Sequence, residues 1–255
     1  MTDLVEQLRR VGMRASAEAL HALLTHAQKS KIGLPEFVEQ LVELELRERD
    51  ARNLARRTRM ATLGRFKPLD HFEWNHPRAI DRDLYEHLLS LDFLESGQNV
   101  LLRGPAGVGK STLAQNLGLR ALERGYTVRY CTLNAALADL LRQESLPATE
   151  RRLKRYLAPD LLILDELGYV PCDSRAADLL FHIVSRRHEQ RSIVITTNLP
   201  FKAWGSVFHD ASCLGALVDR FAQDCHVLDV DADSYRRRKP PPPPRPTSPA
   251  RKRRR

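Results

Sequence analysis

The sequence of 255 residues contains little of what marks secreted, zinc-binding or membrane proteins. Its four cysteines, Cys131, Cys172, Cys213 and Cys225, form no C-x-x-C pair. We therefore expect reduced thiols rather than a disulfide framework or a zinc site. No apolar run approaches the roughly 20 residues of a membrane span, and the N-terminal segment lacks a signal-peptide pattern. These absences predict a cytoplasmic protein with no membrane partner.

Acidic residues are absent from segment 236–255, which carries ten Lys or Arg residues among prolines. Subtracting these ten charges from the net charge of +9 leaves −1 for residues 1–235. The positive charge is therefore largely a property of this tail, and any argument for nucleic-acid binding by the rest must rest on local clusters. Because the tail has too few apolar residues to bury a core, we expect it to be disordered.

The remaining chain divides into three further segments by its pattern. Residues 1–65 show helical periodicity, and Leu34-Pro35 suits a helix start with proline in the first turn. We expect a small all-α domain there that binds DNA or a partner protein. Residues 66–78 are aromatic and flanked by prolines, which is typical of a linker, and residues 79–235 are predicted to form a second, larger domain.

Short apolar runs alternate with helical stretches between residues 79 and 235. Runs that are apolar throughout, such as "LLILD", suit strands covered on both faces, as in a parallel sheet. The predicted fold class is therefore α/β, with a five-stranded parallel sheet flanked by helices. The candidate strands are 99–103, 127–132, 161–165, 192–197 and 226–230.

The stretch "GPAGVGKST" follows the first of these strands and matches the pattern of a phosphate-binding P-loop. Its glycines allow backbone N–H groups to curl around phosphates, its lysine reaches the β and γ oxygens, and its serine offers a hydroxyl to Mg²⁺. A helix follows, and its N-terminus favours an anion. We expect ATP and Mg²⁺ as cofactors, bound by Gly104, Pro105, Ala106, Gly107, Val108, Gly109, Lys110, Ser111 and Thr112.

Polar residues follow two other candidate strands. In "LLILDELGY", Asp165 can join Ser111 in holding Mg²⁺, and Glu166 can act as general base for an attacking water. Asn198 ends the strand "SIVITT" and can orient that water near the γ-phosphate. Taken alone, the acidic pair could be a helix cap, and Asn198 could be a turn residue before Pro200. Together with Lys110 they favour hydrolysis over phosphoryl transfer to a small molecule, which is the reaction of a kinase.

The order of these motifs resembles the IstB family, the transposition helper ATPases of bacterial insertion sequences. The P-loop, "LLILDELGYV", "SIVITTNLPFKAWGSVF", "ALVDRF" and "DSYRRRK" carry the resemblance, which runs from about residue 4 to residue 239. The family belongs to the AAA+ ATPases and is similar to the DnaC-type helicase loaders. The resemblance therefore implies that residues 79–235 form an AAA+ ATPase domain. The P-loop and the acidic motif are widely shared, whereas "TTNLPFKAWGSVF" followed by "LVDRF" is far more discriminating.

The resemblance implies that ATP lies between neighbouring subunits. Asn198 then corresponds to the sensor residue, and Arg220 to the arginine that completes the adjacent subunit's site. Arg187 and Arg191 are second choices for that arginine. Without the resemblance, Arg220 beside Asp219 would be interpreted as a surface ion pair. A phosphate contact by Arg236 stays an open alternative.

A basic helical stretch precedes the linker, and arginines of this kind bind phosphates without discriminating between bases. A solvated helix face is the alternative, which the resemblance disfavours because members of the family bind duplex DNA. A second cluster, in 151–155, either lines the DNA path or lies on the surface. The predicted DNA-binding residues are Arg47, Arg52, Arg56, Arg57 and Arg59.

Two linker aromatics, Phe72 and Trp74, either flank the adenine or pack the two domains together. The predicted function is that of an ATP-dependent regulator of transposition, acting on DNA in the bacterial cytoplasm. As the resemblance implies, it would oligomerise on duplex DNA, remodel it, recruit and stimulate a transposase, and disassemble on ATP hydrolysis. The alternative is a DnaC-like loader of a replicative helicase.

Overall fold

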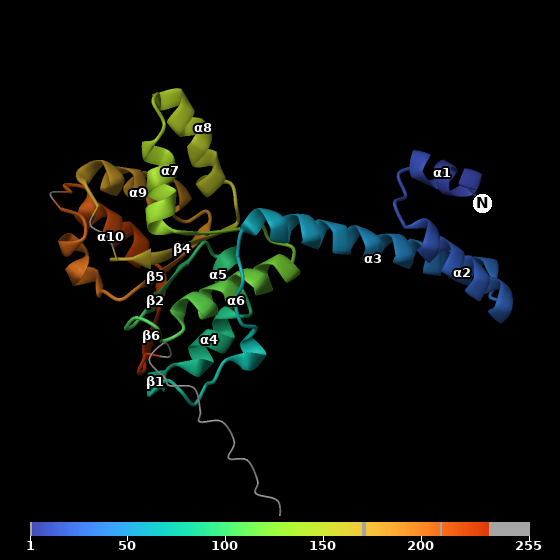
Figure 1. The fold of residues 1–255 in the computed structure, drawn as a ribbon, viewed down its shortest axis with the longest axis horizontal. Coiled ribbons are helices and arrows are strands. Elements are labelled where there is room, and N and C mark those ends of the chain that lie inside the picture. Colours follow the sequence, from blue (N-terminus) through green and yellow to red (C-terminus); the bar gives the residue numbers. More distant parts are fainter. Residues whose placement is uncertain (1, 170–171, 210, 235–255) are drawn as a thin grey trace, which may run out of the picture.

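The structure, a computed structural model, describes residues 2–169, 172–209 and 211–234, so the predicted disordered tail and Arg236 lie outside the described residues. At its centre is a six-stranded sheet in the order β1-β6-β2-β5-β4-β3 (Figure 1). Five of the strands run parallel to their neighbours, as the apolar runs predict. They are β2 (Asn99–Arg103), β3 (Val128–Thr132), β4 (Leu161–Leu167), β5 (Ser192–Thr197) and β6 (Cys225–Asp231).

All five predicted parallel strands are present, and the sheet has one further strand at its edge that the sequence did not indicate. A sixth strand, β1 (Ala79–Ile80), pairs antiparallel with β6. It has two residues, and a strand this short leaves no periodic pattern in the sequence. Strand β4 also continues two residues beyond the predicted run, through an irregularity between Leu164 and Leu167.

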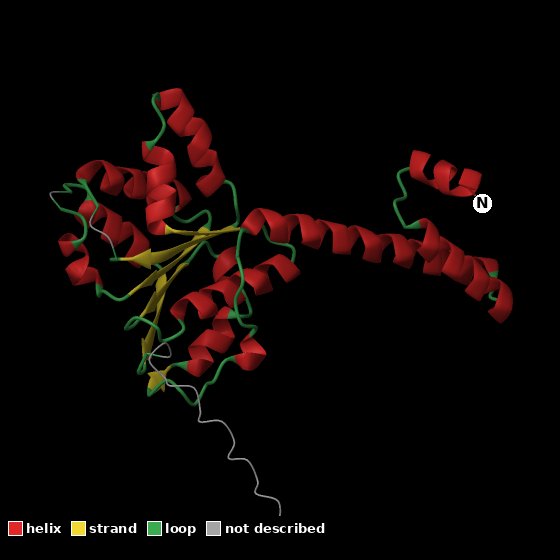
Figure 2. Ribbon diagram, in the orientation of Figure 1, coloured by secondary structure: helices red, strands yellow, loops and turns green. Residues whose placement is uncertain are grey.

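Helices cover both faces of the sheet, so that the parallel strands are buried on two sides (Figure 2). One face packs against α4 (Arg82–Leu88), α5 (Asp92–Glu95) and α6 (Lys110–Glu123). The other packs against the helices α7 (Leu133–Leu141), α8 (Leu146–Leu157), α9 (Ser174–Arg187) and α10 (Leu214–Ala222), together with the 3₁₀ turn η2 (Phe201–Ser206).

The N-terminal segment is helical, as its periodicity predicts. Helices α1 (Thr2–Arg10) and α2 (Ala17–Ser30) lie at the far end of α3 (Leu34–Ala61), away from the sheet (Figure 1). Helix α3 is continuous over 28 residues, and its last residue is buried in the core beside α6. A separate compact all-α domain therefore stays a prediction. None of the helices in the described part of the chain is long and apolar enough to cross a membrane.

The strand order determines which strand ends meet. Strand β5 lies between β2, which leads into the P-loop, and β4, which carries the acidic pair. Because these strands are parallel, their carboxyl ends lie at the same edge of the sheet, where ligands gather in folds of this kind. At that edge the backbone N–H of Gly104 donates to the carbonyl of Thr197 over 3.1 Å.

Candidate functional site

The P-loop connects β2 to α6 and is packed too closely for side chains at its glycines. A Cβ on Gly104 would lie 2.1 Å from the carbonyl oxygen of Val230 in β6. Gly107 and Gly109 have φ values of +81° and +101°, in the left-handed region that side chains rarely adopt. The glycines therefore allow the tight loop whose backbone amides the sequence predicts to hold phosphates.

Lys110 begins α6 and folds back over the loop. Its Nζ donates hydrogen bonds of 2.8 Å and 2.7 Å to the carbonyl oxygens of Gly104 and Pro105. The side chain is buried, with 6% of the residue exposed. Lys110 thus lies against the loop, where the predicted phosphate-binding role requires its ammonium group.

Asp165 lies buried at the end of β4, surrounded by hydroxyl donors from three elements. Ser111 donates to its Oδ1 over 3.0 Å, and Thr196 of β5 donates to the same oxygen. Tyr130 of β3 donates to Oδ2 over 2.5 Å. The predicted pair of Ser111 and Asp165 is thus brought together, and both carboxylate oxygens are fixed in place.

Tyr130 and Thr196 were missed by the sequence analysis. Neither belongs to a recognisable motif, because tyrosine and threonine are ordinary strand residues. The strand order supplies the missing signal, since β3 and β5 flank β4 on either side. Polar residues near the carboxyl ends of those two strands are the ones that can reach Asp165.

Glu166 adopts φ +67°, a left-handed conformation that costs a non-glycine residue about 1–2 kcal/mol. Its backbone N–H donates to the Thr196 hydroxyl over 3.0 Å, so one threonine holds both members of the acidic pair. The half-buried Glu166 lines the same cavity as Lys110 and Ser111. A carboxylate at this wall of the cavity is placed to accept a proton from water.

This cavity, which we call the P-loop pocket, has a volume of about 340 Å³ and lies between the P-loop and segment 65–76. Phe72 lines it, and a Cβ on Gly109 would lie 2.8 Å from the Phe72 ring. Trp74 packs instead on Tyr85 of α4, with ring centroids 5.6 Å apart. Phe72 also packs on Trp74, with ring centroids 4.9 Å apart, and both rings pack against the core. The packing role that the sequence left open therefore applies to both aromatics, and Phe72 lines the pocket as well.

Asn198 follows β5 and is exposed at the sheet edge. It lines a hollow beside the P-loop pocket together with Gly104, Pro105 and Ala106. A Cβ on Gly168 would lie 3.1 Å from its Oδ1. The fold thus places Asn198 beside the P-loop and the turn after Glu166, as its predicted sensor role needs.

Arg220 is exposed on α10, and its guanidinium lies 5.1 Å from the centroid of the Phe181 ring. No ion pair joins it to Asp219 in the part of the chain that the structure describes, so the surface ion pair considered from sequence is not formed. The residue lines none of the cavity around Lys110. Arg220 therefore lies outside the pocket of its own chain, and its role at a neighbouring subunit's site stays a prediction.

Arg187, a second choice for that arginine, is a core residue with 1% of its surface exposed. It donates to five backbone carbonyls, among them Tyr156, Pro159 and Ser192 at 2.9, 2.8 and 2.7 Å. Burial, followed by repulsion from Arg191, lowers its pKa to about 9. Arg187 therefore joins α8 and α9 to β5 and is not available to a neighbouring subunit.

The five arginines predicted to bind DNA fall into two groups. Arg47 pairs with Glu43 at 2.9 Å, and Arg52 donates to the Arg14 carbonyl at 2.5 Å. The other three, Arg56, Arg57 and Arg59, lie at the end of α3 that reaches the sheet, where they line one cavity with residues of β3 and α8.

The donor set at Ser111 and Asp165 fits Mg²⁺. Hydroxyl and carboxylate oxygens are the ligands this hard cation prefers, and Mg²⁺ is usually held by one or two protein oxygens together with substrate phosphates. The described residues contain no cluster of three or more His, Cys, Asp or Glu side chains that could hold a metal by themselves. Ser111 and Asp165 would hold the ion jointly with a bound triphosphate.

Comparisons with known proteins agree with this geometry. A family model described as "IstB-like ATP binding protein" matches residues 6–241. The chain is 34% identical over 236 residues to a protein of Pseudomonas aeruginosa named as the ATP-binding protein of insertion sequence IS21, covering 92% of this chain and 89% of that one. It is 30% identical over 231 residues to the protein named in the same way for IS5376 of Geobacillus stearothermophilus, covering 91% and 92%.

Solved structures share the fold at low sequence identity. The crystal structure of the DnaC helicase loader superposes with a TM-score of 0.50 at 20% identity, covering 62% of this chain and 98% of that one. The replication initiator DnaA bound to AMPPCP and single-stranded DNA gives a TM-score of 0.53 at 22% identity, covering 65% and 50%. These neighbours share the fold of the sheet and its covering helices with this chain.

Proposed function

Because the chain belongs to the IstB-like ATP-binding protein family, we propose that it is an ATP-dependent DNA-binding regulator of transposition. In this proposal ATP-bound subunits assemble on duplex DNA, deform it, and recruit and stimulate a transposase. Hydrolysis to ADP and phosphate then releases the assembly. The observation that supports it most directly is the family match over residues 6–241, which includes the N-terminal helices as well as the ATPase fold.

The pocket residues support ATP hydrolysis with defined roles. Lys110 would exchange its two loop carbonyls for phosphate oxygens. Glu166 would accept a proton as water attacks the γ-phosphorus and the bond to the β-phosphate oxygen breaks. Asn198 would orient that water. Mg²⁺, when bound, neutralises charge on the phosphates.

Arg220 would act on the site of a neighbouring subunit. Its exposure and its place outside the pocket around Lys110 support this role. A guanidinium that neutralises charge in the transition state accelerates hydrolysis about 10³–10⁵-fold. ATP hydrolysis would then depend on assembly, and the rate of hydrolysis would determine how long the complex remains on DNA.

A helicase loader is the second candidate, because the DnaC loader shares the fold. The two functions differ in the nucleic acid and in the protein that they engage. A loader would bind a replicative helicase, whereas a transposition regulator would bind duplex DNA and a transposase. The match of the N-terminal helices to the insertion-sequence family favours the transposition regulator.

The proposal is tested by strand-transfer assays with the transposase of the same insertion sequence. We expect stimulation that requires ATP and duplex DNA, and that ADP does not support. Glu166→Gln should bind ATP and remain on DNA for longer, while Glu144→Gln, an exposed carboxylate outside the pocket, should behave as the native protein. No stimulation in the presence of ATP and DNA, together with binding to a replicative helicase, would favour the loader.

A further inference from the structure

We propose that the phosphate backbone of duplex DNA binds in a groove between the end of α3 and α8, which we call the basic groove. This inference rests on the proposed DNA binding and assigns it to a particular surface. The groove has a volume of about 550 Å³, and three elements that are distant in sequence supply its cations. These are Arg56, Arg57 and Arg59 from α3, Arg129 from β3, and Lys154 and Arg155 from α8.

Among the described residues, no Asp or Glu lines this groove. Two carboxylates nearby are engaged at its margin. Asp160 accepts from the backbone N–H and the hydroxyl of Thr127 at 2.8 Å and 2.7 Å, and Asp139 of α7 accepts from Arg152 at 2.8 Å and lies 3.8 Å from Arg155. Six positive charges face one concave surface, and among the described residues only Arg155 of the six is paired with a carboxylate. The local potential is therefore positive and attracts a polyanion.

Three of the cations are free to bind a ligand. Arg56, Arg59 and Lys154 are exposed, and within the described ranges none of them forms an ion pair or a hydrogen bond through its side chain. Guanidinium groups donate paired hydrogen bonds to phosphate, and lysine adds a mobile point charge. These three residues form the rim of the groove that DNA would reach first.

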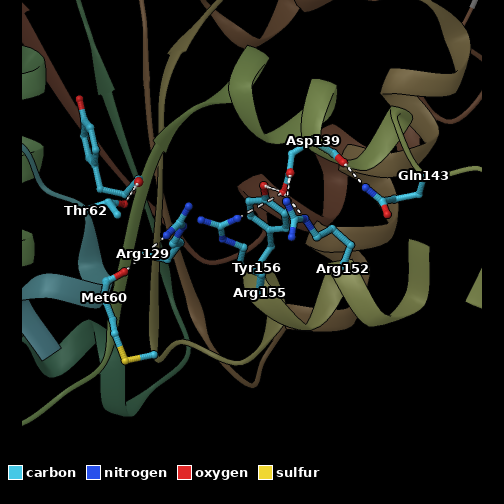
Figure 3. Close-up of polar contacts among 9 residues, drawn as sticks. Met60, Thr62, Arg129, Asp139, Gln143, Arg152, Arg155 and Tyr156 are labelled. Carbon is cyan, nitrogen blue, oxygen red and sulfur yellow. Dashed lines mark hydrogen bonds and ion pairs between the residues drawn. The ribbon is translucent and has the colours of Figure 1, made fainter. Parts of the chain in front are cut away.

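Two further cations are held in position by neutral partners. Arg57 donates to the Leu122 carbonyl at 3.1 Å, and Arg129 donates to the Met60 carbonyl at 3.4 Å (Figure 3). A carbonyl fixes the guanidinium without cancelling its charge, whereas a carboxylate would do both. Arg57 and Arg129 are therefore ordered cations below the rim, which reduces the entropy lost on binding.

Helix α8 is oriented by Asp139 of α7. Arg152 donates two hydrogen bonds to that carboxylate, at 2.8 Å and 2.5 Å, and Tyr156 adds one at 2.6 Å. The hydrogen bonds from Arg152, and then from Tyr156, outweigh the effect of burial and lower the pKa of Asp139. Arg155 lies farther away, at 3.8 Å, and extends toward Arg129 (Figure 3). The Asp139 cluster thus fixes the helix that presents Lys154 and Arg155 to the groove.

The lining favours duplex over single-stranded DNA. Sites for single strands combine a basic groove with aromatic side chains on which bases stack. Within the described residues, no Phe, Tyr or Trp lines the basic groove, and its apolar surface comes from residues such as Met60, Val128 and Pro159. A cationic groove without a stacking surface suits the phosphates of a duplex whose bases remain paired.

The basic groove contains fewer residues of α3 than the helix face predicted from sequence, and it adds residues of β3 and α8. Arg47 and Arg52 do not line the groove, and each has an intramolecular partner. Lys154 and Arg155, which the sequence left between a DNA path and a plain surface, belong to it. The DNA-binding surface is then a property of the fold rather than of one helix.

The test compares two doubly neutralised proteins of equal charge. Arg59→Gln with Lys154→Gln removes one free cation from each wall of the groove, and Arg142→Gln with Arg175→Gln removes two exposed cations elsewhere. The measurement is duplex affinity with a non-hydrolysable ATP analogue as a function of salt. Each phosphate contact contributes about 0.9 to the slope of log K against log salt. For the groove variant, the magnitude of this slope should fall by about 2, and duplex affinity at moderate salt should fall at least tenfold. The control variant should keep the native slope and affinity.

Other outcomes have separate meanings. A native protein that fails to bind duplex DNA with ATP contradicts the proposed function itself. Native binding with an unchanged groove variant overturns only the groove. If the groove variant binds DNA normally but no longer self-associates, the groove holds an acidic segment of a second copy. That result would also overturn the proposal that the groove binds DNA. If the double variant does not melt like the native protein, Lys154→Gln alone should lower the slope by about 1.

Discussion

The phenol of Tyr130 donates a hydrogen bond of 2.5 Å to Oδ2 of Asp165, across two neighbouring strands. Burial, together with this bond, raises the pKa of Tyr130 above its ordinary value, so the phenol remains a donor at neutral pH. The backbone carbonyl of the same residue accepts a 2.7 Å hydrogen bond from Thr62, just beyond α3. Strand β3 therefore lies between the end of α3 and Asp165, the carboxylate that would hold Mg²⁺.

We predict that Tyr130→Phe weakens hydrolysis more than ATP binding. The variant keeps the ring and loses one hydrogen bond to a charged group, worth about 1.5–3 kcal/mol. Because that bond orients Asp165, kcat should fall roughly tenfold or more, and half-maximal activity should need more Mg²⁺. The measurement is ATPase kinetics over a Mg²⁺ titration, with the Kd for ATP measured separately.

Tyr126→Phe is the matched control, since Tyr126 packs in the core just before β3 and does not contact Asp165. It should leave kcat and the Mg²⁺ requirement unchanged. If both variants lowered kcat equally, the phenol of Tyr130 would have only a general effect on packing.

A second prediction concerns Gly104. Gly104→Ala should prevent ATP binding and lower the melting temperature, because the new Cβ would lie 2.1 Å from a backbone oxygen that cannot turn aside. Gly215→Ala on α10, where nothing lies within 4 Å of the new Cβ, should change stability by no more than about 1 kcal/mol. Thermal melting and ATP titration check both, and ATP binding by Gly104→Ala would contradict the described loop packing.

These residues show what the sequence could and could not predict. Lys110 and Asp165 were found because a phosphate cradle and its carboxylate need fixed residue types at fixed spacing. Tyr130 and Thr196 were missed because their role follows from strand order, which periodicity does not define. Arg187 was a second choice for the arginine that completes a neighbouring site. In sequence, an arginine at the end of a helix looks the same whether it points to solvent or, as here, is buried against five carbonyls.

The composite basic groove was also beyond the sequence. Arg59 and Lys154 are 95 positions apart, and only the contact of α3 and β3 at the sheet edge brings their elements together. By contrast, the alternation of apolar runs predicted all five parallel strands, because burial on both faces leaves a strong signal. The two-residue β1 left none.

A third prediction concerns Glu45, which fixes the loop between α1 and α2 on α3. Burial raises its pKa, but hydrogen bonds from Arg49 and from the backbone N–H groups of Arg14 and Ala15 outweigh this and lower it overall. A lowered pKa means stability that is present above the unfolded value of 4.5 and is lost as the pH falls through the folded value. Glu45→Gln should cost about 1–3 kcal/mol at neutral pH and little in acid.

Hydrogen exchange of the Arg14 and Ala15 amides measures this directly, comparing native and variant protein at each pH. Exchange should be faster in Glu45→Gln at neutral pH, and the difference should shrink in acid. Glu43→Gln, which removes an exposed partner of Arg47 alone, should leave these amides protected. Equal protection in the native protein and Glu45→Gln at neutral pH would contradict the role assigned to this carboxylate.

The central claim, that neighbouring subunits share each ATP, is tested most directly by mixing two inactive variants. Arg220→Ala retains its own pocket, and Glu166→Gln retains its own Arg220, so each can supply what the other lacks. Random assembly of equal amounts would place both functional parts at about one quarter of the sites. We predict that the mixture recovers about that fraction of native ATPase activity, while each variant alone remains inactive. Full activity of Arg220→Ala by itself, or no recovery on mixing, would contradict the account.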